Sequence, residues 1–177
     1  MILSQNTVKC QEKIDTVLYF DKIYSAFPVI SVKCDGKVSV RFESGEIDGV
    51  SGSGENFVTN KDISHMSQRM HSVGFIRLMV ENLSDNDAYI DSVKLLYSHY
   101  PVNNEGRFKC SDPLINKIYD VCLHTLKICR QNTHLDSPTH QEPIACTGDY
   151  YIQALMEYMN IYDPTLTAFD IYRTSQI

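Results

Sequence analysis

The hydrophobic pattern of residues 16–100 has a period of two, which is typical of β-strands. In the clearest case, Val38, Val40 and Phe42 alternate with polar Ser39 and charged Arg41. Similar segments, rich in β-branched and aromatic residues, predict strands at Thr16–Phe20, Phe27–Cys34, Lys37–Ser44, Phe75–Asn82 and Ala88–Tyr100. Short strands at this spacing favour a sandwich of antiparallel sheets.

Two glycine-containing segments predict the connections between these strands. Asp35-Gly36 is a turn dipeptide, so we expect a hairpin that joins Phe27–Cys34 to Lys37–Ser44. Residues 45–54 are rich in Gly and Ser and predict a flexible loop. A phosphate-binding loop is disfavoured there, because the glycines neither open a helix nor match a dinucleotide fingerprint.

The pattern becomes helical after Pro101–Gly106, a polar segment that reads as a linker between domains. Beyond it, apolar residues recur every three or four positions. Asp112-Pro113 predicts an N-cap followed by the first helical position, with the helix running to about Arg130. A second helix is predicted from near Thr147, and a third from Asp163-Pro164 to the end of the chain.

We therefore expect a β-sandwich over residues 1–100, a linker at 101–107, and the opening helices of a larger helical array at 108–177. Three amphipathic helices do not enclose their own apolar stripes. Four side chains of the second and third helices are thus expected to be exposed, or covered by self-association of the chain: Leu155, Met159, Phe169 and Tyr172.

Composition narrows the class of protein. The 177 residues carry a formal net charge of −6 and no basic run, which argues against a nucleic-acid partner. The start lacks a signal-peptide pattern, and no stretch of about 18 apolar residues occurs, so no membrane span is expected. The cytoplasm is the expected location, or the periplasm or exterior if a leader precedes this segment. The six cysteines lack C-x-x-C spacing, so we expect reduced thiols, no metal and no cofactor.

The segment 136–149 is the strongest candidate for chemistry. It reads Asp-Ser-Pro-Thr-His-Gln-Glu-Pro-Ile-Ala-Cys-Thr-Gly-Asp and holds three carboxylates in a connection stiffened by two prolines. Glycoside hydrolysis needs a carboxylic acid that stays protonated near neutral pH, and neighbouring carboxylates and partial desolvation favour that form. Glu142 lies between Asp136 and Asp149 and fits this role.

Simpler interpretations exist for the same residues. Taken singly, Asp136 can cap the loop, and Asp149 can interact with the dipole at the start of the second helix. A metal site is disfavoured because its candidate ligands fit no zinc spacing, so sugar contact or hydrogen bonding within the loop suits them better; these candidates are His134, His140, Glu142 and Cys146.

The same segment resembles the signature of the bacterial α-L-rhamnosidases, Asp-Cys-Pro-x-Arg-x-Glu-Arg-x-Gly-Trp-x-Gly-Asp. The positions that match in register are Asp136, Pro138, Glu142, Gly148 and Asp149. Weaker similarity extends over residues 16–177. Among the positions that depart from the signature, Ser137, His140 and Cys146 stand where the family has Cys, Arg and Trp.

The resemblance implies an (α/α)6 barrel and hydrolysis of terminal α-L-rhamnosides with inversion of configuration. It implies that Glu142 is the general acid, and that Asp136, Asp149 and His140 contact the carbohydrate substrate. The family's general base comes from a later part of the barrel, so these 177 residues alone are expected to be catalytically incomplete. Two alternatives remain: a noncatalytic carbohydrate-binding β-sandwich, with an exposed Tyr or Phe cluster on a sheet face, and an (α/α)6 glycosidase acting on another sugar.

Overall fold

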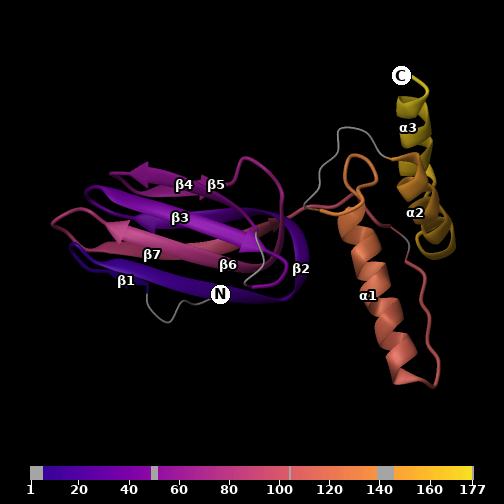
Figure 1. Ribbon diagram of the computed structural model, residues 1–177, viewed down its shortest axis with the longest axis horizontal. Helices are drawn as coiled ribbons and strands as arrows, with labels where there is room; N and C mark the ends of the chain where they lie inside the picture. The colour runs from indigo at the N-terminus through magenta and orange to yellow at the C-terminus, as the bar shows by residue number, and fades with distance from the viewer. Residues whose placement is uncertain (1–5, 49–51, 104, 139–145, 177) are drawn as a thin grey trace. The chain divides into compact units, whose positions relative to one another are not determined.

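The computed structural model describes residues 6–48, 52–103, 105–138 and 146–176. These described residues form seven strands followed by three helices (Figure 1). The chain divides into two compact units, Met1–Tyr97 and Ser98–Ile177. We call them the β unit and the helical unit and describe each by itself.

The strands of the β unit are antiparallel. Within the described residues they are β1 (Thr7–Val8), β2 (Lys13–Lys33), β3 (Val38–Gly45), β4 (Ser53–Thr59), β5 (Ile63–Met66), β6 (His71–Asn82) and β7 (Ala88–Tyr97). Their order is β1-β7-β2-β6-β3-β4, and β5 pairs with β2. The predicted antiparallel β unit is therefore confirmed.

Strand β2 is 21 residues long and changes its neighbours along its length. Its first part, up to Ala26, pairs with β6, and the pairing register shifts between Tyr19 and Tyr24. From Ala26 onward β2 pairs with β7, and from Val29 it also pairs with β5. The single strand thus takes part in two groups, one with β6, β3 and β4 and one with β5, β7 and β1.

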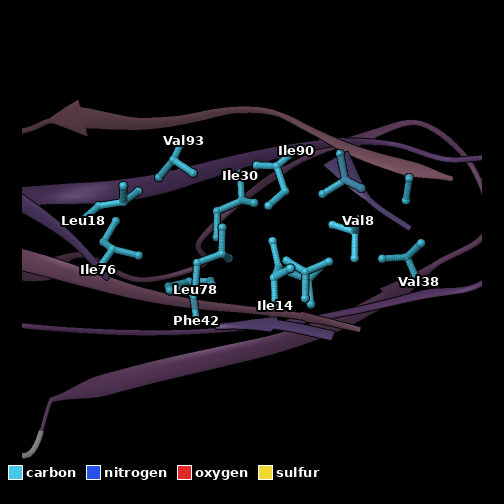
Figure 2. Close-up of a cluster of buried hydrophobic side chains, with 14 of the residues drawn as sticks. Val8, Ile14, Leu18, Ile30, Val38, Phe42, Ile76, Leu78, Ile90 and Val93 are labelled. Carbon is cyan, nitrogen blue, oxygen red and sulfur yellow. The ribbon is translucent and has the colours of Figure 1, made fainter. Parts of the chain in front are cut away.

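The hydrophobic core gathers side chains from both groups. Ile30, Ile90 and Val93 come from the later part of β2 and from β7, and they face Phe42 and Leu78 of β3 and β6 (Figure 2). Strand β3 alternates buried and partly exposed positions as its sequence predicted, because only one of its faces contacts this core.

The predicted hairpin around Asp35-Gly36 is wrong. Strands β2 and β3 follow each other in sequence, but β6 lies between them and pairs with both. The turn dipeptide reverses the chain locally, and Gly36 has a φ of +136°. It does not decide how its flanks pair. The β2 flank pairs with β7 and β5, whereas β3 pairs with β6 and β4.

Three further strands were not predicted from the sequence: β1, β4 and β5. Strand β4 begins at Ser53, so the predicted loop is shorter than residues 45–54; residues 49–51 of it lie outside the described residues. Strand β4 alternates exposed and half-buried positions, as an edge strand does, so its hydrophobic signal is weak.

The helices of the helical unit begin where the sequence predicted. Helix α1 spans Pro113–Cys129, and the Asp112 carboxylate caps it by accepting hydrogen bonds from the backbone N–H of Leu114 (2.8 Å) and Ile115 (3.4 Å). Helix α2 spans Thr147–Asn160 and α3 spans Thr165–Thr174. No helix in the described part of the chain has the length and apolar character needed to cross a lipid bilayer.

These helices expose much of their apolar surface. Leu155, Met159, Phe169 and Tyr172 are exposed as predicted, and Met159 reaches 84%. On α1, Leu114 and Ile118 are exposed too, whereas the buried residues lie near the C-terminal end of the helix. The helical periodicity is therefore correct, but the stripes it creates are only partly covered within this unit.

Candidate functional site

The carboxylates predicted from the sequence occupy the two ends of the connection between α1 and α2. Asp136 is exposed, and its Oδ1 accepts a hydrogen bond from the backbone N–H of Ser137 (2.7 Å). Asp149 is exposed in the first turn of α2, where the helix dipole favours a negative charge. The other two predicted site residues, His140 and Glu142, lie outside the described residues.

The segment that leads to Asp136 is tied to the helices by main-chain contacts. The N–H of Leu135 donates to the carbonyl of Cys129 at the end of α1 (2.9 Å). The side-chain amide of Gln153, on α2, donates to the carbonyl of Leu135 (2.8 Å). The backbone immediately before Asp136 is therefore held by both α1 and α2.

A buried cluster of polar side chains holds the same segment from within. His134 Nδ1 lies 2.6 Å from Asp170 Oδ2, and His134 Nε2 lies 2.8 Å from Glu157 Oε1. Thr133 Oγ1 donates to Asp170 Oδ1 (2.5 Å), and the His134 N–H donates to Asp170 Oδ2 (3.1 Å). Arg130 completes the cluster, with its Nε 2.5 Å from Glu157 Oε1. We call these five residues the His134 cluster.

The geometry of the His134 cluster requires a charged imidazole. A neutral imidazole has one N–H, but each ring nitrogen of His134 faces a carboxylate oxygen, so both must donate. Burial alone lowers the pKa of His134, but the hydrogen bonds to Asp170 and then Glu157, with their charges, raise it to about 9. Burial raises the pKa of Asp170, but the hydrogen bonds from His134 and Thr133 lower it overall.

The cluster is electrically balanced when His134 is protonated. Two cations, Arg130 and His134, then face two carboxylates, Glu157 and Asp170, and all four side chains are almost fully buried. The guanidinium of Arg130 also lies 3.6 Å from the carboxylate of Asp163. Without the proton on His134, the buried pair of carboxylates would keep only one full counter-charge.

Sequence reasoning did not find this cluster. Glu157 and Asp170 are charged residues on buried faces of α2 and α3, and nothing in their spacing indicates that they meet the same histidine. From the sequence, His134 was only a candidate ligand of the disfavoured metal site. Both of its ring nitrogens face carboxylates, so it has no nitrogen available for a metal in this arrangement.

Comparison with known families finds that the helical unit is similar to a domain of glycoside hydrolases, the 6-hairpin glycosidase domain. Residues 103–170 match the family described as the bacterial alpha-L-rhamnosidase 6 hairpin glycosidase domain. The matched range includes the whole carboxylate segment 136–149. The relationship of this chain to the bacterial α-L-rhamnosidases, inferred from that segment, is thereby confirmed.

Solved structures share the fold of the chain. A rhamnosidase from Klebsiella oxytoca with rhamnose bound aligns with a TM-score of 0.79 and 15% identity over 92% of this chain and 35% of its own. A GH78 family rhamnosidase of Bacillus sp. GL1 aligns with a TM-score of 0.75 and 18% identity, over 94% and 18% of the two chains. The α-L-rhamnosidase from Dictyoglumus thermophilum gives 0.64 and 17%, over 87% and 19%.

The identities are low, so these alignments establish the fold alone. The chain spans 35%, 18% and 19% of the lengths of these three structures. Among curated protein sequences, none matches this chain.

Proposed function

We propose that the chain contributes part of the catalytic site of an α-L-rhamnosidase-like glycoside hydrolase that cleaves terminal α-L-rhamnosides with inversion. The observation that carries the proposal is the family match over residues 103–170, which contains the carboxylates of segment 136–149. In this proposal residues 1–100 are a β-sandwich domain, 101–107 a linker, and 108–177 the first helices of an (α/α)6 barrel.

Each carboxylate of the segment has a separate role in this proposal. Glu142 is the general acid that protonates the departing glycosidic oxygen. Asp136 and Asp149 accept hydrogen bonds from sugar hydroxyls, and both residues are exposed. His140 donates to the sugar or to a carboxylate, at the position where the family has Arg.

An inverting reaction also needs a second carboxylate that activates water on the opposite face of the sugar. We propose that this general base is absent from these 177 residues. The 177-residue chain alone should then show no turnover of an aryl α-L-rhamnoside. Measurable turnover by this chain would refute this part of the proposal, because it would require a general base among these residues.

Sugar specificity is supported by one relative. The structure of the rhamnosidase from Klebsiella oxytoca holds rhamnose, and it shares the fold of 92% of this chain. We therefore propose a rhamnoside as the substrate. The departures at Ser137, His140 and Cys146 would alter the sugar contacts more than the reaction type.

The test compares two leaving groups in the natural gene product that contains these residues. Glu142→Gln keeps the shape of the side chain but removes the proton that it transfers. The kcat/KM for an alkyl α-L-rhamnoside should fall by about 10²–10⁴-fold, whereas that for a nitrophenyl rhamnoside should fall far less, because nitrophenolate hardly needs protonation. Glu81→Gln, on an exposed position of β6, is the matched control and should change neither value. Equal losses for both substrates in Glu142→Gln would remove Glu142 as the general acid.

A further inference from the structure

The β unit contains an open polar pocket that the proposed glycosidase chemistry does not use. Its volume is about 600 Å³, which is in the range of sites for small organic ligands. Its lining belongs to β4, β5 and the turn after β5: Gly54, Glu55, Asn56, His65, Gln68 and Arg69. All of these residues lie in the β unit and far along the chain from segment 136–149.

The carboxylate of Glu55 is held in a fixed position in this pocket. Its Oε1 accepts a hydrogen bond from Ser67 Oγ (2.5 Å), and its Oε2 lies 3.3 Å from His65 Nε2. The His65 ring in turn stacks on Phe57, with the ring centroids 4.2 Å apart. The Glu55 side chain keeps 16% of its surface exposed, so its oxygens retain capacity to accept further hydrogen bonds from a ligand.

A buried layer of hydrogen bonds supports Glu55 from below. Ser67 is almost fully buried, and its Oγ lies 2.8 Å from Nε2 of the buried His71. On the other side of the ring, His71 Nδ1 lies 2.8 Å from Ser44 Oγ and 2.7 Å from Ser53 Oγ. These bonds connect β3, β4 and β6, and they hold Ser67, which in turn fixes the Glu55 carboxylate of the pocket.

The electrostatics of this layer favour an ionised Glu55 and a neutral His71. Burial lowers the pKa of His71, although the nearby Glu55 opposes this effect. Burial raises the pKa of Glu55, but the hydrogen bonds from Ser67 and His65 lower it overall. The pocket thus offers a carboxylate acceptor at neutral pH.

The mouth of the pocket combines donors and acceptors instead of a single sign of charge. Arg69 is exposed and only donates, Glu55 only accepts, and the exposed amides of Asn56 and Gln68 do both. A phosphate would be repelled by Glu55, and a metal cation by Arg69. Vicinal hydroxyl groups suit the arrangement, because each hydroxyl both donates and accepts.

We propose that this pocket binds a neutral saccharide, with Glu55 accepting from its hydroxyl groups and Arg69 donating to them. The lining residues all belong to the β unit, and the proposal does not depend on the proposed glycosidase function. It provides the β unit with a ligand-binding role of its own.

The test is a heteronuclear NMR titration of the 177-residue chain with methyl glycosides of L-rhamnose, D-glucose and D-galactose. We expect at least one of them to cause saturable shifts at the backbone amides of Glu55, His65 and Gln68. Glu55→Gln keeps an oxygen for Ser67 but loses the charge, and should weaken binding roughly 10-fold or more. Arg69→Ala, at an exposed position, should weaken binding without affecting the fold.

Glu43→Gln is the matched control, because Glu43 is a half-buried glutamate of neighbouring β3 that pairs with Arg41 and does not line the pocket. It should leave the affinity unchanged. Saturable binding that survives both Glu55→Gln and Arg69→Ala would overturn the proposal. So would the absence of shifts around Glu55 with all three glycosides, shifts confined to the helical unit, or saturation of the pocket by inorganic phosphate or Ca²⁺ instead of a sugar. Hydrolysis is not measured in this test, so its result is independent of the proposed rhamnosidase activity.

Discussion

Protonation of His134 is predicted to stabilise the helical unit by about 3 kcal/mol. The pKa of His134 is raised from its ordinary value of 6.5 to about 9 in the folded chain, chiefly by the hydrogen bonds to Asp170 and Glu157 that outweigh burial. Each tenfold change in proton affinity corresponds to about 1.4 kcal/mol, so this difference corresponds to about 3 kcal/mol. The full value applies below pH 6.5, where the folded and the unfolded chain both hold the proton.

The sign of the pH dependence follows from the direction of the pKa change. Because the folded chain binds the proton more tightly, the stabilising contribution is fully present below pH 6.5 and is lost as the pH rises through about 9. The free energy of unfolding of the helical unit should therefore fall by about 3 kcal/mol over this range.

Urea unfolding followed by far-ultraviolet circular dichroism measures this effect, because the helices α1, α2 and α3 all lie in the helical unit. NMR titration of the His134 imidazole supplies a direct second measurement. In His134→Gln the drop in stability between pH 6.5 and 9 should disappear. His124→Gln, a half-buried histidine of α1 outside the His134 cluster, is the matched control and should retain it. An imidazole of His134 that titrates near 6.5 in the folded chain would refute the reasoning.

Three further predictions concern positions where the structure isolates a single cause. Asp112→Ala removes the N-cap of α1 and should cost about 1 kcal/mol, measured by urea unfolding, whereas Asp120→Ala on the exposed middle of α1 should cost far less. Gly36→Ala should destabilise the β unit by about 1–3 kcal/mol, because φ is +136° and a Cβ would lie 2.4 Å from the Cβ of Ser84; an unchanged Tm would contradict this. Met159→Glu should reduce self-association in sedimentation velocity, and a parent chain that is monomeric at all concentrations would remove the premise.

Local signals in the sequence were sufficient for the helix boundaries and for most strands. The Asp112-Pro113 pair predicts the start of α1 because capping depends only on residues within one turn. The alternation at Val38, Val40 and Phe42 predicts a strand with one buried face, and all three side chains are buried.

The pairing between strands that are distant in sequence could not be predicted from local signals. The Asp35-Gly36 turn indicated a hairpin, but the neighbour of both β2 and β3 is β6, which is separated from the turn by more than one element. A turn constrains only its own backbone, whereas the order of strands depends on which apolar faces cover each other. Strand β4, with its partly exposed edge, gave too weak an alternation to be recognised.

The residues of the candidate site likewise fall into those that local sequence predicts and those that it does not. Asp136 and Asp149 could be found because their spacing matches a family signature within one continuous segment. The His134 cluster could not, because its charges come from α2, α3 and the end of α1. In a sequence, a buried Glu157 or Asp170 cannot be distinguished from a solvated residue on a helix face.

The His134 cluster also determines how the carboxylate segment begins. Thr133 and His134 are bound to Asp170, and Leu135 is bound to Gln153, so the residue before Asp136 is fixed by side chains of α2 and α3. If charge maintains this arrangement, removing one carboxylate charge should weaken the hold while preserving the shape.

Asp170→Asn keeps the size of the side chain but removes its charge and the acceptor oxygen Oδ2 that faces His134. The amide oxygen can still accept from Thr133, but the negative charge beside His134 is lost, so the pKa of His134 should fall below about 9. Above the new pKa, the backbone N–H of Leu135, which donates to Cys129, should exchange with solvent faster than in the parent. Asp163→Asn is the control, because Asp163 contacts the cluster only through Arg130 at 3.6 Å and should leave the titration of His134 nearly unchanged. If Asp170→Asn did not lower the pKa of His134, the carboxylate of Asp170 would not be what keeps the imidazole protonated.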